Sequence, residues 1–137
     1  MGFERDPSHW LRKHTPEEWI QAALAELHRA EARVKANDLS AGLAGCKRAA
    51  GMALNGALLV EPNESWGRSF VDHVAALSRD ENVPVRVREA CLELVATRPP
   101  SHDILRLRSP RSDEKLLDAA RDVMAHAYAV VKRHEGK

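Results

Sequence analysis

Apolar residues recur at three- and four-residue steps along most of the chain, which is the spacing that places them on one face of an α-helix. Helix-breaking residues interrupt this pattern at positions 37–38, 62–63, 82–84 and 97–110. The segments between the breaks predict helices at about residues 15–37, 39–60, 65–77, 87–95 and 112–134. We therefore expect an all-α fold, an antiparallel helical bundle of about five helices.

The first predicted helix begins with a strong start signal, Thr15-Pro16-Glu17-Glu18. Threonine can cap the helix, proline suits the first position, and Glu18 completes a capping box. Residues 1–14 precede this signal and carry scattered charge, so we expect them to form an N-terminal arm. A chain of 137 residues fits one domain, and we place the helical bundle at residues 15–137.

The second predicted helix carries a face of small residues at four-residue spacing, made by Ala41, Gly45, Ala49, Ala53 and Ala57. Small side chains let another helix backbone approach closely, which increases the van der Waals contact per turn. Each glycine costs about 1 kcal/mol of helix propensity relative to alanine, so tight packing has to compensate. This face predicts a central core helix, and the other interpretation is a ligand cavity.

The last predicted helix, residues 112–134, has two different faces. Ser112 is expected to cap it, since a serine side chain accepts hydrogen bonds from the first turn. The stripe expected to face the core is formed by Leu117, Ala120, Met124, Ala127, Tyr128 and Val131. Arg121 falls on the edge of this stripe and His126 on the far side, separated by Asp118, Asp122, Ala125 and Ala129. This second face, which mixes charge with small residues, is the candidate functional surface.

Composition narrows the class of protein. Hydrophobic residues make up 44% and charged residues 30% of the chain, which is typical of a soluble globular domain. Lysine and arginine total 21 and aspartate and glutamate total 20, so the net charge does not by itself indicate a nucleic-acid binder. The apolar runs are shorter than the roughly 20 residues that span a bilayer. We therefore expect no membrane segment and a cytoplasmic location.

The sequence lacks several motifs that carry catalysis or hold cofactors. It has no Glu-x-x-His pair for a di-metal site, no phosphate-binding loop, no dinucleotide fingerprint and no nucleophile elbow. Cys46 and Cys91 have no cysteine or histidine at metal-binding spacing, so we expect buried reduced thiols. His73 lies beside Val74 on a helical stripe and is interpreted as a packing residue at the core boundary. We therefore expect neither a metal nor a cofactor.

Arginines cluster around the long break before the last helix. Because guanidinium groups grip phosphate with paired donors, a surface for phosphate or nucleic acid could be formed by Arg98, Arg106, Arg108 and Arg111. The alternative is a solvated loop, and the balanced overall charge gives the binding surface no support.

Arg121 and His126 form the candidate catalytic pair, with Asp122 and Tyr128 in supporting positions. Histidine can transfer a proton and arginine can stabilise charge on a phosphate, so such a pair can cleave a phosphodiester without a metal. On one helix the two side chains point about 140° apart, and a two-fold dimer could bring both copies to one cleft. In the alternative interpretation, Arg121 pairs with a neighbouring carboxylate and His126 is merely exposed.

The order of these elements resembles the HEPN superfamily of small all-α prokaryotic domains, over residues 15–133. The alanine-rich second helix is similar, with Cys46–Ala50 in its middle and Leu54–Leu59 at its end, and so is the closing helix. Ribonuclease members carry an arginine, a polar residue, a short spacer and a histidine, often with a tyrosine two residues later. The residues that match this pattern are Arg121, Asp122, His126 and Tyr128.

The resemblance implies a homodimer formed through the motif helix and leaves three functions open. The first is a non-catalytic module that binds a nucleotide, a nucleic acid such as RNA, or a protein, often beside a nucleotidyltransferase-like partner. The second is a toxin-like, metal-independent endoribonuclease that uses Arg121 and His126. The third is a plain helical interaction protein. We favour the first, because the motif lies within the last helix and the net charge is near neutral.

Overall fold

The structure, a computed structural model, describes residues 13–61, 70–96 and 110–134. Within these residues the chain forms five helices and no strand, which confirms the predicted all-α fold. The helices are α2 (Pro16–Lys35), α3 (Leu39–Val60), α4 (Phe70–Ser78), α5 (Val85–Ala96) and α7 (Pro110–Arg133). None of the helices in this part of the chain combines the length and the apolar character needed to cross a membrane.

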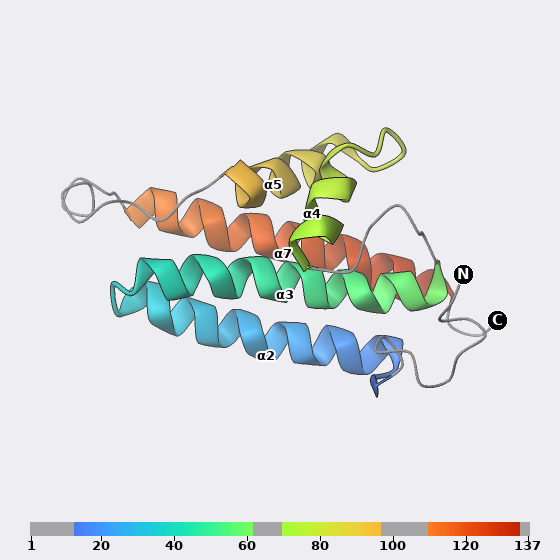
Figure 1. The fold of residues 1–137 in the computed structure, drawn as a ribbon, viewed down its shortest axis with the longest axis horizontal. Coiled ribbons are helices and arrows are strands. Elements are labelled where there is room, and N and C mark those ends of the chain that lie inside the picture. The colour runs from blue at the N-terminus through green and yellow to red at the C-terminus, as the bar shows by residue number, and fades with distance from the viewer. Residues whose placement is uncertain (1–12, 62–69, 97–109, 135–137) are drawn as a thin grey trace.

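Helix α3 lies at the centre of the bundle, between α2 on one side and α7, α4 and α5 on the other (Figure 1). Helices α2 and α3 form an antiparallel hairpin through a tight turn, in which Asn37 has a φ of 63°. Helices α3 and α7 run parallel, and Glu61 at the end of α3 meets Arg133 at the end of α7 at 2.7 Å. A parallel pair needs a connection that runs back along the bundle from the end of α3 to the start of α7. The short helices α4 and α5 form part of this connection.

Two of the predicted helix starts agree with the structure, and one does not. The Thr15 hydroxyl accepts a hydrogen bond from the Glu18 backbone N–H (3.1 Å), and the Glu18 carboxylate accepts one from the Thr15 N–H (2.8 Å), so the capping box is confirmed. The bounds predicted for the second helix are also confirmed, with Asp38 as its cap. The predicted Ser112 cap is wrong, because α7 already begins at Pro110. Proline is well tolerated at a first helical position, where its missing N–H has no helical partner.

The small-residue face of α3 packs against α2, as the sequence predicts. A Cβ atom built on Gly45 would lie 2.8 Å from the Cβ of Ala30 in α2. One built on Gly56 would lie 2.8 Å from the backbone carbonyl oxygen of Pro16, at the start of α2. Larger side chains at either end of the hairpin would therefore force the two helices apart.

A buried carboxylate links the same two helices. Glu26 of α2 is only 8% exposed and accepts hydrogen bonds from Arg29 (2.8 Å) and from Nε and Nη2 of Arg48 in α3 (3.1 and 2.8 Å). Burial raises the pKa of Glu26, but these hydrogen bonds outweigh it and hold the pKa below its ordinary value. The ion pair between Glu26 and Arg48 therefore links α2 to α3 beside Gly45.

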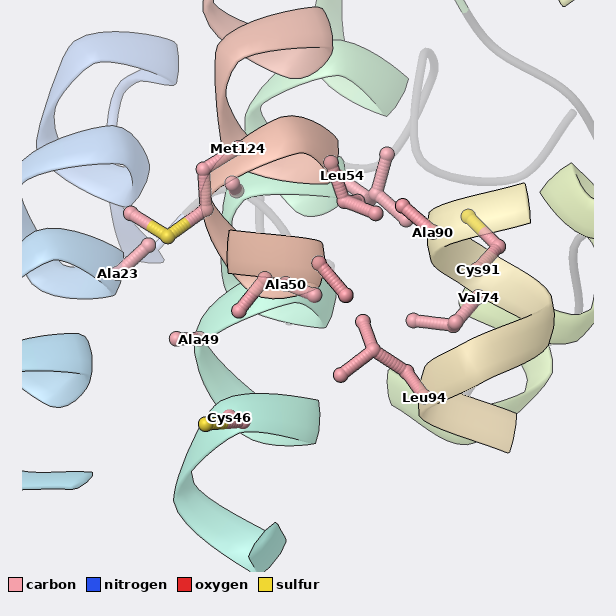
Figure 2. Packing of buried hydrophobic residues seen from close by; sticks show 14 of the residues in the cluster. Ala23, Cys46, Ala49, Ala50, Leu54, Val74, Ala90, Cys91, Leu94 and Met124 are labelled. Carbon is pink, nitrogen blue, oxygen red and sulfur yellow. The ribbon is translucent and has the colours of Figure 1, made fainter. Parts of the chain in front are cut away.

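The core fills the space between α3, α7 and the two short helices. Figure 2 shows Met124 of α7 beside Ala23 of α2, while Ala90 and Leu94 project from α5 toward α3. Cys46 and Cys91 are both buried and free, as predicted. Burial raises the pKa of the Cys46 thiol to about 11 and that of Cys91 to about 12.

Two polar side chains are fully buried. His73 of α4 is completely inaccessible, so its predicted place at the core boundary is wrong. Asn55 of α3 is equally buried, and within the described residues neither its amide nitrogen nor its amide oxygen has a hydrogen-bond partner. Burying an amide without partners lowers the stability of the fold, since the group loses its bonds to water. The sequence around Asn55 and His73 did not predict that either side chain would be fully buried.

We expect Ala53→Leu to lower the free energy of unfolding by about 1–3 kcal/mol, because Ala53 is fully buried in the core and extra methyl groups overpack it. Ala44 lies exposed on the same helix, so Ala44→Leu is the matched control and should change stability by less than about 0.5 kcal/mol. Urea unfolding followed by circular dichroism measures both variants. Equal midpoints for the two variants would contradict the close packing of this face.

Candidate functional site

Helix α7 presents one continuous exposed face. Its exposed residues include Asp118, Arg121, Ala125, Tyr128, Ala129 and Lys132, and its half-buried ones include Asp122 and His126. The predicted division between core stripe and outer face is confirmed, except at Tyr128, which is 47% exposed. Tyr128 lies about 40° beyond Met124 around the helix, which places it at the edge of the stripe.

Arg121 is held by two carboxylates. Its Nη2 donates a hydrogen bond to Glu31 of α2 (2.6 Å), and its Nη1 donates one to Asp118 one turn earlier in α7 (2.9 Å). The alternative interpretation of Arg121 as an ion-pairing residue is therefore confirmed. Glu31 is 90 residues away in the sequence, so its part in this pair had no local signal.

Asp122, the predicted supporting carboxylate, turns away from Arg121. It pairs with Arg86 of α5 across a distance of 3.3 Å. Tyr128 instead lies next to Lys132, whose Nζ is 5.9 Å from the centre of the tyrosine ring. Arg121, Asp122 and Tyr128 therefore contact different residues and do not contact one another through these interactions.

His126 lies on the opposite edge of the face. Burial lowers its pKa, and the positive charge of Arg133 acts in the same direction, whereas the carboxylates of Glu61 and Asp80 oppose them. The net effect is a pKa below the ordinary histidine value, so the imidazole is neutral at pH 7. A neutral imidazole can accept a proton.

The C-terminal end of α7 is fixed by an ion cluster that the sequence did not reveal. Glu61 accepts hydrogen bonds from Nε and Nη2 of Arg133 (3.1 and 2.7 Å) and lies 2.7 Å from Nε2 of His134. Burial raises the pKa of Glu61, but His134 and Arg133 outweigh it and lower the pKa overall. Arg133 and Glu61 of this cluster act in opposite directions on the pKa of His126.

Arg121 and His126 therefore do not form one site within a single chain. Arg121 faces α2 and its Glu31, whereas His126 lies on the side of Glu61 at the end of α3. The exposed side chains of Ala125 and Ala129 separate them. A general base has to come within hydrogen-bond reach of the proton that it moves. The hydrogen bonds of Arg121 within the described residues go to Glu31 and Asp118 and not to His126.

A shallow groove of about 310 Å³ lies beside Arg121, between α2 and α7. His28 and Glu31 line it together with the apolar side chains of Leu24, Leu27 and Met124. Leu24 is 47% exposed and so adds apolar surface to this groove. Arg121 therefore lies beside the apolar side chains that line this groove.

The predicted arginine surface falls outside the part of the chain that the structure describes. Arg98, Arg106 and Arg108 lie outside the described residues, as does the side chain of Arg111, whose backbone belongs to the first turn of α7. The described residues contain no group of three or more histidine, cysteine or acidic side chains that could hold a metal ion.

We expect stability to fall as the pH drops below about 6.5 because of His126. Its folded-state pKa is lowered, so its contribution is fully present above the unfolded-state value and is lost as the unfolded chain takes up the proton first. His126→Asn should therefore flatten the pH dependence of the free energy of unfolding between about pH 7 and 5. His28→Asn, at an exposed histidine of α2, is the control, and identical slopes for both variants would contradict the burial of His126.

Comparison of the chain with protein-family models, with curated proteins and with solved structures gives no match.

Proposed function

We propose that this chain is a non-catalytic, HEPN-like helical module that binds a partner through the exposed face of α7. The order of the helices, the alanine-rich central helix and the motif from Arg121 to Tyr128 support the resemblance. The observation that carries the proposal is the position of Arg121 and His126 on opposite edges of that face, with exposed alanines between them.

The surroundings of Arg121 do not favour contact of its guanidinium with a phosphate, which cleavage of a phosphodiester would need. Glu31 and Asp118 already neutralise the guanidinium, at 2.6 and 2.9 Å. A phosphate would have to displace a carboxylate before it could form the paired hydrogen bonds that guanidinium groups make with phosphate. An arginine poised for catalysis would instead have its donors directed at the position of the substrate.

The middle of the α7 face suits contact with another helix. Ala125 and Ala129 are exposed on successive turns, and small side chains allow a second helix to approach closely. Tyr128 on α7 and Leu24 on α2 add exposed apolar surface beside them. We propose a second copy of the chain as the first occupant, in an isologous dimer. A nucleotide, an RNA or a nucleotidyltransferase-like protein is then the further partner.

A metal-independent endoribonuclease is the second candidate. The neutral, half-buried imidazole of His126 favours it, because such a group can act as a general base at neutral pH. In a two-fold dimer, His126 of one copy and Arg121 of the other would have to meet at one cleft.

We expect the chain to self-associate and Ala125→Arg to weaken that association at least about tenfold, because a charge buried in a close helix contact is costly. Ala44→Arg places the same side chain on the exposed face of α3 and is the matched control. Sedimentation velocity over a range of concentrations measures both. A chain that stays monomeric, or equal effects of the two substitutions, would remove the dimer face.

The two functions differ in one assay, the cleavage of RNA in the presence of EDTA. If the chain is a binding module, neither the wild type nor His126→Ala should cleave. If it is a ribonuclease, cleavage should persist in EDTA and fall by about 10²–10⁴-fold in His126→Ala, the usual loss for a general acid or base. Circular dichroism of the variant checks that folding is intact. Wild-type cleavage that depends on His126 would overturn the non-catalytic proposal.

A further inference from the structure

A second hollow lies between α5 and the N-terminal half of α7. Its volume is about 780 Å³, which makes it larger than the groove beside Arg121. Its floor contains Ala90 of α5 and Ala119 of α7, both buried and both small. We call this hollow the α5–α7 groove.

Two ion pairs bridge the groove from one helix to the other. Arg86 of α5 lies 3.3 Å from Asp122 of α7, and Glu93 of α5 lies 3.5 Å from Lys115 of α7. The pairs are seven residues apart on each helix, so α5 and α7 run antiparallel here and the bridges are about 10 Å apart. The alanine floor lies in the two turns between them.

Acidic side chains repeat at four-residue intervals along both walls. Glu114, Asp118 and Asp122 follow one another on α7, and Glu89 and Glu93 do so on α5. Like charges at this spacing repel each other on a helix. Among the described residues that line the groove, these five carboxylates face two cations, Arg86 and Lys115, which leaves a net charge of −3 on this part of the lining.

Several of these carboxylates are not fully neutralised by a neighbouring cation. Glu89 and Glu114 are exposed and, within the described part of the chain, form no ion pair. Asp118 is shared with Arg121, itself divided between two carboxylates. An incoming cation could therefore pair with the groove without first breaking an existing bridge.

We infer that the α5–α7 groove is a docking site for a helical segment of a partner protein that is rich in lysine or arginine. Cations at four-residue intervals on such a helix would meet the carboxylates of both walls, and its small or aliphatic residues would lie on Ala90 and Ala119. Nucleic acids and anionic lipid surfaces would be repelled by the same charge. The groove adjoins the α7 face at Asp118 and Asp122, but neither residue is used in the contact proposed around Ala125 and Ala129, so the inference does not rest on the proposed function.

The test uses a synthetic, fluorescently labelled amphipathic peptide with lysines at three- and four-residue intervals on one side and alanine and leucine on the other. Anisotropy titrations with the full chain should show binding at low salt that weakens as salt is added. Glu89→Lys should weaken the affinity at least about tenfold, because it puts a like charge against the peptide. Glu81→Lys makes the same change at an exposed residue outside the groove and should alter the affinity by less than about twofold.

A peptide of the same composition in shuffled order separates docking from general attraction to acidic surface, and it should bind more weakly than the amphipathic one. Equal binding of the two peptides, equal effects of the two substitutions, or no binding at low salt would overturn the inference. Self-association of the chain that Glu89→Lys abolishes would also overturn it, since the groove would then hold a second copy rather than a basic partner.

Discussion

The close contact between α2 and α3 is the constraint on which the rest of the bundle depends. Gly45 and Gly56 bring the two helices so near that a single methyl group would meet Ala30 or the Pro16 carbonyl. The buried Glu26 then closes the same contact with hydrogen bonds from both helices. With α3 fixed against α2 on one side, its other side is left to support α7, α5 and α4.

Much of this fold was predictable, because local chemistry determines it. The capping box at Thr15 and the bounds of α3 follow from residues that are neighbours in the sequence. The start of α7 was misplaced because Ser112 and Pro110 are both acceptable near a helix start, and the proline is the residue at which the helix begins. The burial of Asn55 and His73 depends on which other helices pack over these side chains, and the spacing of apolar residues along one helix does not contain this information.

The candidate site shows the same limit. The angle between Arg121 and His126 is a property of one helix, so the sequence separated them correctly. Their partners come from elsewhere: Glu31 belongs to α2, and the Glu61 cluster joins the ends of α3 and α7. Such contacts depend on how helices are arranged in space. The charge of the α5–α7 groove was hidden for the same reason, because α5 and α7 each look like an ordinary mixed-charge helix until they lie side by side.

The buried thiols have a practical consequence for work on the α7 face. Burial raises the pKa of Cys46 to about 11 and that of Cys91 to about 12, so both thiols stay protonated at pH 7. The thiolate is the reactive form, and both sulfur atoms are shielded from reagents. A cysteine introduced at an exposed position would therefore react with maleimide far faster than either native one. Spin labels or fluorophores could be attached to the wild-type background, and the proposed self-association could be followed without first removing the natural cysteines.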